Sequence, residues 1–270
     1  MPNVTGRILN GLSRQARAAG ASLHIHHVAS DEVDSLHKPE TQPVALVNGQ
    51  LDGLVLVGRL PQRFAAMVSK QLPCVSIIER VPGVSIDCID HDDADSVSQL
   101  VDRLVAAGHQ RIGFVSESQM RSVYASRYAG LVHALVMRGL EIDPQNAMNV
   151  HAPRHGVEAV AERVAKRIRA GVTGWVAVHD MVGYHAMESL RGMGLSAPKD
   201  YSIVGFDNLQ PPHRSLPKLV SIESPFEAIG QTAVRVLMRR MSQDRNEVLH
   251  SLFRCTVVEG KTVGPAPRMS

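Results

Sequence analysis

The sequence lacks most of the features that mark specialised classes of protein. Aromatic residues make up 4% of the 270 residues, with one tryptophan, so we expect an interior packed mainly with Val, Leu, Ile, Ala and Met. The three cysteines, Cys74, Cys88 and Cys255, lie far apart and form no CxxC pair, which argues against a disulfide framework or a zinc ribbon. No apolar run approaches the roughly 18 residues that a membrane span needs, so we expect no membrane segment.

Charge of one sign is not in large excess either. The chain has 29 basic and 26 acidic residues and a formal net charge of +3, which is too mild to indicate a nucleic-acid binder by itself. The first twenty residues hold no apolar core of the kind found in a secretory signal, so we expect a cytoplasmic protein. With 44% hydrophobic and 20% charged residues, the composition is that of an ordinary globular chain.

Short runs rich in β-branched residues alternate with amphipathic segments along the whole chain. The clearest helix is predicted at 93–107, where apolar residues recur on one face and Gly108 follows the end. Near-continuous apolar strands between such helices predict parallel sheets that are covered on both faces. The predicted strands are 22–28, 53–57, 74–78, 85–89, 111–116, 174–178, 202–206 and 219–222, and the predicted helices are 4–19, 61–71, 93–107, 126–138, 155–170, 180–193 and 225–241.

This pattern predicts an α/β protein with two doubly wound parallel-sheet lobes. Ligands of such folds bind beyond the carboxyl ends of the strands, where this sequence places mostly polar and charged residues. A small polar ligand between the lobes is therefore expected. The chain opens on a helix with no strand before it, although the first strand of such a lobe normally lies near the middle of the sheet. We therefore expect the first strand to be missing and native sequence to lie upstream.

Six landmarks of the sequence resemble the LacI/GalR family of transcriptional repressors. They occur in the order and at the spacing of that family, and the resemblance runs from about residue 4 to residue 263. No one of the six is decisive alone. The landmarks are LDGLVL at 51–56, LPCVS at 72–76, VAAGHQRIGFV at 105–115, RYAGL at 127–131, VGFDN at 204–208 and LPKLVSI at 216–222.

The resemblance implies a two-lobed effector-binding core, like that of type I periplasmic sugar-binding proteins, with three crossovers between the lobes. The first lobe would comprise about 1–108 plus 226–252, and the second about 109–225 plus 253–270. Such cores form homodimers, and closure on a small effector changes how an N-terminal helix-turn-helix headpiece holds operator DNA. This sequence lacks the headpiece, so we expect no specific operator binding by the chain alone. A sugar, sugar phosphate or purine-like effector is implied, with no cofactor and no metal.

Two residues carry most of the implied ligand binding. Arg127 aligns with the family arginine that holds effector hydroxyls or carboxylates, a task suited to a planar and permanently charged fork of donors. Its structural alternative is a solvated arginine at a helix start. Asp207 aligns with the family aspartate that accepts hydrogen bonds from sugar hydroxyls, and its alternative is a turn aspartate bonded to its own backbone.

Two further positions follow predicted strands. Asp93 aligns with an effector contact of some members, and it also lies where a helix N-cap belongs. His179 replaces the asparagine of the family's Asn-Asp strand end, and its proton count changes near neutral pH. Asp180, which follows it, is expected to cap the helix that it opens.

The ligand-stacking aromatics of the family are replaced in this sequence. His151 falls where members often place an aromatic residue, and Val4 and Thr5 take the place of aromatics in the first loop, with Thr5 retained as a candidate contact. The stacking surface is therefore smaller than in a typical hexose site. Two histidines together with Arg127 could instead favour an anionic or phosphorylated ligand.

Two other classes of function compete with the regulator. A stand-alone sugar- or nucleoside-binding transport protein has the same fold, but the absence of a signal sequence disfavours it. An α/β enzyme is the weakest alternative, because the sequence has no GxGxxG after a strand and no P-loop, GxSxG or HExxH motif. His24 and His26 could face one side of a strand as metal ligands, yet no further ligand at a fixed short spacing completes such a site.

Overall fold

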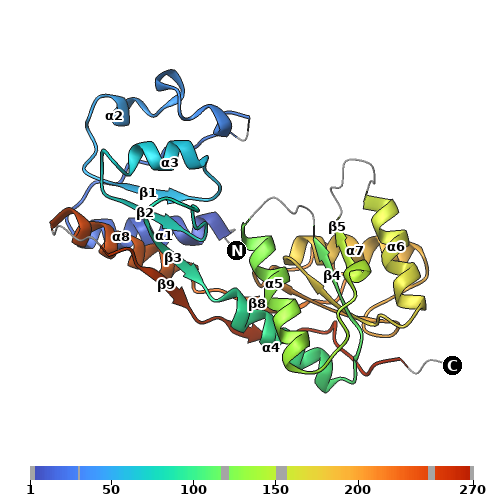
Figure 1. Ribbon diagram of the computed structural model, residues 1–270. Coiled ribbons are helices and arrows are strands. Elements are labelled where there is room, and N and C mark those ends of the chain that lie inside the picture. Colours follow the sequence, from blue (N-terminus) through green and yellow to red (C-terminus); the bar gives the residue numbers. More distant parts are fainter. Residues whose placement is uncertain (1–3, 30, 117–121, 150–156, 243–246, 268–270) are drawn as a thin grey trace. The chain divides into compact units, whose positions relative to one another are not determined.

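The protein folds into two compact α/β units. The computed structural model describes residues 4–29, 31–116, 122–149, 157–242 and 247–267 (Figure 1). The first unit comprises Met1–His91 and Pro225–Phe253, and the second comprises Asp92–Ser224 and Arg254–Ser270, so the chain passes between them three times. None of the helices that the structure describes is long and apolar enough to cross a membrane.

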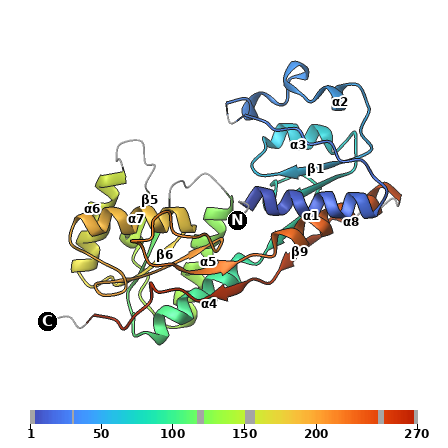
Figure 2. The same ribbon diagram turned by 180° about the vertical axis from the view of Figure 1, so that it is seen from behind.

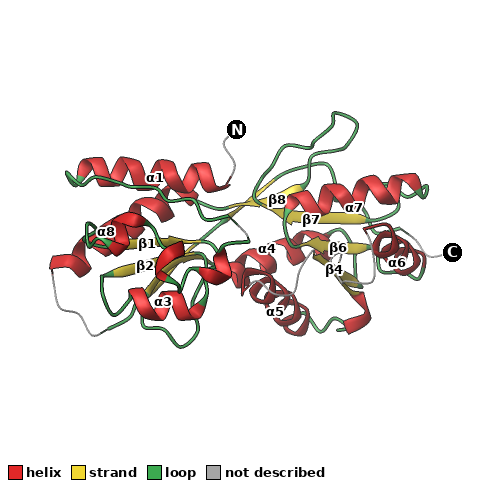
Figure 3. Cartoon of the chain, turned by 90° about the horizontal axis from the view of Figure 1, so that it is seen from above, coloured by secondary structure: helices red, strands yellow, loops and turns green. Residues whose placement is uncertain are grey.

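The first unit is built on a parallel sheet of four strands in the order β1-β2-β3-β9. Helices α1 and α8 lie side by side on one face of this sheet (Figure 2), and α3 covers the other face (Figure 3). The strands are β1 (Leu54–Val57), β2 (Cys74–Ile77), β3 (Asp87–His91) and β9 (His250–Phe253). The helices are α1 (Val4–Ala18), α2 (Val44–Val47), α3 (Gln62–Val68) and α8 (Phe226–Ser242).

The strands of the first unit separate two apolar clusters. On the α1 and α8 side, Ile77 and Ile89 pack with Phe226, while on the α3 side Leu56 packs with Phe64. Alternate residues of a strand point to opposite faces, so each face of the sheet builds its own cluster. Gly11 lies where α1 meets α8, and a Cβ atom there would approach a backbone oxygen to 2.1 Å, so glycine permits the close packing of the two helices.

The predicted strand 22–28 is wrong. The structure shows this segment as coil, with Leu23 and Ile25 exposed, and His24, His26 and His27 are exposed as well. A strand exists only where a neighbouring backbone accepts and donates its hydrogen bonds. In the described part of the sheet, β1 is an edge strand that pairs with β2, and 22–28 pairs with neither.

The second unit contains a six-stranded sheet in the order β10-β8-β7-β6-β4-β5. All neighbours are parallel except β10, which runs antiparallel to β8. Helix α7 lies on one side of this sheet and α4 and α5 on the other (Figure 3). The strands are β4 (Ile112–Ser116), β5 (Ala147–Asn149), β6 (Gly174–Ala177), β7 (Ser202–Phe206), β8 (Val220–Glu223) and β10 (Thr256–Val258). The helices are α4 (Asp93–Ala106), α5 (Ser122–Met137), α6 (Val157–Arg169) and α7 (Asp180–Gly192), and short 3₁₀ turns lie at Val33–Ser35, Pro39–Thr41 and Pro144–Asn146.

The structure divides the chain at a different place from the expected lobes, which were 1–108 plus 226–252 and 109–225 plus 253–270. Helix α4 lies in the second unit, so the first crossover falls between His91 and Asp92. The apolar face of α4 explains this, because Val97, Leu100 and Leu104 join the core that α5 and the six-stranded sheet build. A helix belongs to the unit in which it buries its apolar stripe.

Candidate functional site

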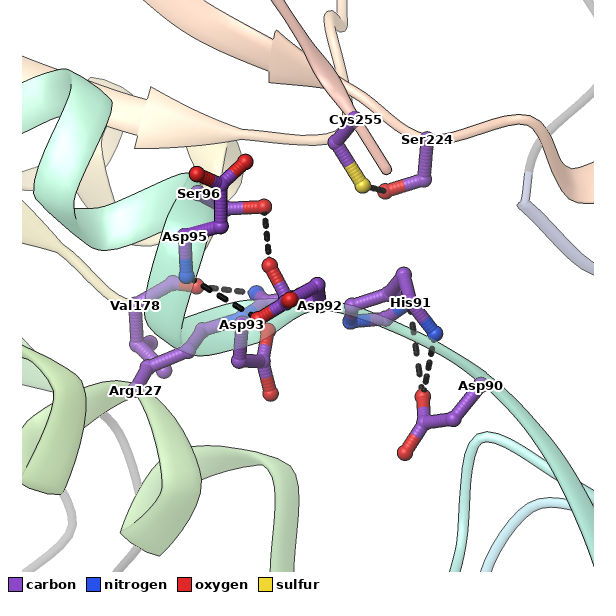
Figure 4. Close-up of polar contacts among 10 residues, drawn as sticks. All are labelled: Asp90, His91, Asp92, Asp93, Asp95, Ser96, Arg127, Val178, Ser224 and Cys255. Carbon is purple, nitrogen blue, oxygen red and sulfur yellow. Dashed lines mark hydrogen bonds and ion pairs between the residues drawn. The ribbon is translucent and has the colours of Figure 1, made fainter. Parts of the chain in front are cut away.

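Arg127 holds a buried guanidinium at the centre of a polar cluster in the second unit. It lies in the second turn of α5 rather than at a helix start, and 3% of the residue is exposed. Its Nε donates to Oδ1 of Asp93 at 2.9 Å, and its Nη1 donates to the carbonyl oxygen of Val178 (Figure 4). The alternative of a solvated arginine at a helix start is therefore excluded, because both contacts remove this side chain from water.

Phe206 and Asp207 extend the cluster from the end of β7. The guanidinium carbon of Arg127 lies 4.0 Å from the centre of the Phe206 ring, a cation–π contact. Burial opposes the charge of Arg127, but the carboxylates of Asp93 and Asp207 outweigh burial and raise the pKa of the guanidinium. Arg127 therefore stays charged, and the nearby carboxylates balance that charge.

Asp93 directs its side chain toward Arg127, and its neighbour Asp92 caps helix α4 in its place. Oδ1 of Asp92 accepts a hydrogen bond from the Asp95 amide at 3.0 Å, which makes Asp92 the N-cap of α4. The capping alternative for Asp93 is therefore wrong. Asp93 is 5% exposed and directs its carboxylate toward α5 (Figure 4).

A left-handed turn after β7 positions Asp207. The φ angles of Asp207 and Asn208 are 94° and 50°, a region that Asp and Asn enter more readily than other residues with a Cβ atom. The turn is held in place because the Asp207 amide donates to the Ile222 carbonyl at 2.8 Å, and the Asn208 side chain donates to Glu223 at 2.7 Å. Asp207 is half-buried, so the backbone of this turn, more than burial, fixes the position of the residue.

His179 rather than Asp180 caps helix α7. His179 is the N-cap of α7, with its Nδ1 accepting from the Val182 amide at 3.4 Å, so the prediction that Asp180 caps this helix is wrong. Asp180 is fully buried and accepts from the Leu209 amide at 2.7 Å and from the Ser221 hydroxyl at 2.8 Å. Burial raises the pKa of Asp180 well above its usual range, although these hydrogen bonds act against the rise.

Two further predicted residues belong to helices, His179 at the N-cap of α7 and Thr5 in α1. His179 is half-buried, and its ring centroid lies 6.2 Å from that of Tyr124, a residue of α5 that acts electrostatically on Arg127. Thr5 is exposed near the start of α1 and belongs to the first unit. His151 lies outside the described residues. Within the part of the chain that the structure describes, the one group of three metal-ligating side chains lies in the first unit.

Sequence reasoning missed the apolar and backbone parts of this site. Phe206 stands inside the VGFDN landmark, yet its role beneath the Arg127 guanidinium was not predicted. The Val178 carbonyl could not be found from sequence, since every residue offers one. Together, a buried cation, two carboxylates and an aromatic face form a polar cluster in the second unit.

Comparisons with known proteins agree with this architecture. Residues 101–263 match the family model described as "Periplasmic binding protein-like domain". The transcriptional repressor CytR of Escherichia coli K12 is 28% identical over 223 residues, which cover 80% of this chain and 64% of CytR. The repressor PurR of Pectobacterium atrosepticum is 28% identical over 167 residues, which cover 61% of this chain and 48% of PurR. The chain thus spans less than two thirds of the length of these relatives.

A solved structure of the transcriptional regulator CelR in complex with cellobiose has the same fold. It superposes with a TM-score of 0.81 at 21% identity and covers 96% of this chain and 79% of that chain. The predicted fold class is confirmed: the protein has a two-lobed, mainly parallel-sheet α/β fold. On the family match, which extends over more than half of its length, the chain belongs to the periplasmic binding protein-like domain family and is homologous to LacI-family transcriptional regulators.

Proposed function

We propose that this chain is the effector-sensing part of a LacI-type transcriptional regulator. The homologues are transcriptional repressors, which favours this function over a transport protein or an enzyme. In the proposed mechanism, a small polar ligand binds at the Arg127 cluster and alters operator binding by a helix-turn-helix segment outside this sequence. The regulator would act in the cytoplasm as a homodimer.

The charge balance of the cluster favours a neutral ligand rich in hydroxyl groups. One guanidinium faces two carboxylates, Asp93 and Asp207, both of which act electrostatically on it. Because Asp93 already pairs with Arg127 at 2.9 Å, little positive potential is left to attract a phosphate. A sugar or nucleoside offers hydroxyl donors to Asp207 without adding a negative charge. This balance is the observation that carries the proposal, and it disfavours the anionic ligand suggested by Arg127 and the two histidines.

Matched pairs of ligands test the charge of the effector. We expect a thermal-shift screen to find stabilisation by a neutral sugar or nucleoside, and a weaker effect from its phosphorylated form. Suitable pairs are ribose with ribose 5-phosphate, glucose with glucose 6-phosphate and adenosine with AMP, and cellobiose is a further neutral probe. A ligand present at about 100 times its Kd stabilises the folded state by roughly 2.7 kcal/mol. Stronger stabilisation by the phosphate esters would contradict the proposal.

The variant Asp207→Asn tests the site itself. Asparagine tolerates a positive φ angle as aspartate does, so the turn after β7 is kept while the charge is removed. We expect the ligand found in the screen to bind at least tenfold more weakly, since a hydrogen bond to a charged group contributes about 1.5–3 kcal/mol. Asp52→Asn, at an exposed position of the first unit, is the control and should bind normally. Equal affinities of both variants, measured by calorimetry, would remove Asp207 from the site.

A further inference from the structure

The first unit brings a cysteine, an aspartate and a histidine together on two neighbouring strands. Cys88 and Asp90 are alternate residues of β3 and therefore point to the same face of the sheet. His250 begins β9, and the parallel register of the two strands places it directly beside Cys88. The Cys88 thiol, an Asp90 carboxylate oxygen and a His250 ring nitrogen all lie within 4.8 Å of one another, and no other such group occurs among the described residues.

The surroundings of Cys88 are unusual for a cysteine that only fills space. It is 1% exposed, yet it belongs to neither apolar cluster of the first unit. On β2 its register partner is Ser76, whose hydroxyl interacts with the thiol, and the Asp90 carboxylate also acts on it. A cysteine that serves as a small hydrophobic residue packs among aliphatic side chains instead. This thiol lies in a row of polar side chains across three strands.

The other two side chains give the cluster access to solvent. The His250 side chain is 37% exposed and that of Asp90 is 15% exposed, and their Nε2 and Oδ2 atoms are 3.8 Å apart. An ion can therefore enter from the His250 side, and water can complete its coordination there. Burial raises the pKa of Cys88 to about 11, so an arriving cation has to displace the thiol proton into solvent.

We propose that Cys88, Asp90 and His250 bind one zinc-like divalent cation, with water as the fourth ligand. Sulfur, nitrogen and carboxylate oxygen are the donors of zinc sites, whereas Mg²⁺ and Ca²⁺ select oxygen donors alone. Tetrahedral zinc places its donor atoms about 3.5 Å apart, so the cluster has to contract by roughly 1 Å. Rotation of the exposed His250 side chain supplies most of that movement.

The ion would fasten β3 to β9 beside two of the crossovers. Strand β3 ends at His91 and β9 at Phe253, and after each of these residues the chain passes into the second unit. Binding would therefore fix the register of these strands where they leave the first unit. The site shares no residue with the Arg127 cluster, so it stands or falls independently of the proposed regulatory function.

Titration of the purified, metal-free full chain with Zn²⁺ and Co²⁺ tests this site. We expect calorimetry to give one high-affinity Zn²⁺ per chain, and Co²⁺ to produce the near-ultraviolet charge-transfer band of a thiolate ligand. Saturating Zn²⁺ should raise Tm by about 5 °C and slow amide exchange in β9. His250→Ala and Cys88→Ser should each weaken binding by more than about 100-fold, because changes in outer-shell residues alone cost about 10–100-fold.

Matched controls separate this site from other thiols and imidazoles. Cys74→Ser removes a buried thiol of the neighbouring strand, and His27→Ala removes an exposed imidazole of the same unit, and both should bind Zn²⁺ as the unchanged chain does. Because His250 is exposed, we expect His250→Ala to keep the fold even if Cys88→Ser, at a buried position, disturbs it. Absence of the cobalt charge-transfer band, or Zn²⁺ affinity unaffected by His250→Ala, would overturn the proposal.

Discussion

The two units bury an arginine–aspartate pair in different ways. In the first unit, Asp87 is buried and its Oδ2 lies 2.6 Å from Nε of Arg240, but the Arg240 side chain is 17% exposed. In the second unit, the side chains of Arg127 and Asp93 are 4% and 5% exposed. A partly solvated guanidinium can fall back on water when its partner is removed, whereas a fully buried one cannot. The second unit thus holds an ion pair in its interior, as expected of a ligand-recognition site rather than of a salt bridge near the surface.

The apolar cores of the two units also differ, in their size and continuity. The first unit has separate apolar clusters on the two faces of a four-stranded sheet, while the second has one continuous cluster around six strands. A larger continuous core excludes water more completely and so makes polar groups inside it more dependent on their partners. Trp175, the one tryptophan of the chain, is buried in β6 and gives a fluorescence signal for unfolding of the second unit.

The largest effect is expected when the Arg127–Asp93 ion pair of the second unit is broken. Arg127→Met leaves Asp93 without its cation in a dry interior and should lower the free energy of unfolding of this unit by about 3–5 kcal/mol. Urea unfolding followed by Trp175 fluorescence measures this loss. As the control, Arg240→Met breaks the pair of the first unit and should leave the Trp175 transition unchanged. A loss below about 1 kcal/mol for Arg127→Met would show that water reaches Asp93.

A smaller effect should follow from filling space beside the tryptophan. A Cβ atom at Gly113 would lie 2.4 Å from the Trp175 ring, which is buried and held by the hydrogen bond that its Nε1 donates to the Val172 carbonyl. Gly113→Ala should therefore cost about 1–3 kcal/mol, as overpacking of a core does. In the first unit, a Cβ atom at Gly53 would meet the end of the Leu237 side chain at 2.9 Å, which can rotate away, and the Pro73 carbonyl oxygen only at 3.2 Å. Gly53→Ala should cost less in chemical unfolding monitored by circular dichroism, and equal costs would contradict the difference in rigidity.

The smallest expected effect concerns pH. Burial lowers the pKa of His109, whose ring contacts the Thr173 and Ser202 hydroxyls at 2.8 Å each. The unfolded chain therefore binds a proton on His109 more readily than the folded chain does. This contribution to stability is complete above the unfolded pKa near 6.5, and it is lost as the pH falls from there toward the lower folded value.

Comparison with His109→Gln isolates this contribution. The raised pKa of Asp180 has the opposite consequence in the same unit, because stability is lost as the pH rises above about 3.8 toward the folded value. We subtract the free energy of unfolding of the variant from that of the unchanged chain at each pH between 5 and 7.5. This difference cancels the contribution of Asp180, which both chains share. We expect the difference to grow with pH and then level off above about pH 6.5. A flat difference would mean that His109 is not desolvated.

Strands that are buried on both faces were predicted to within two residues at either end. The segments 112–116, 174–177 and 202–206 read as continuous apolar runs because both faces of the sheet are covered. Strand β9 was missed, since its residues alternate between exposed and half-buried and its sequence, HSLF, carries no strong signal. The segment 22–28 was predicted wrongly for the converse reason, as it has the residues of a strand without a partner.

The candidate site was predicted in part. Arg127 and Asp207 were found through landmarks of the sequence, and the structure places both in one cluster with Asp93. Which carboxylate of Asp92, Asp93 and Asp95 faces the arginine could not be predicted, because three acidic residues within four positions are equivalent as sequence. The position of α5 beside α4 decides it, and that contact joins residues 34 positions apart.

Resemblance to a known family pointed to Arg127 and Asp207 as candidate ligand contacts, while the sequence by itself determined the α/β class and the order of most elements. It could do so because apolar periodicity and glycine-terminated helices are local properties of the chain. Only the tertiary structure decided that α4 belongs to the second unit, that His179 rather than Asp180 caps α7, and that Cys88 meets His250. Each of these depends on which distant backbone supplies a hydrogen bond or a packing face, and local sequence does not specify that partner.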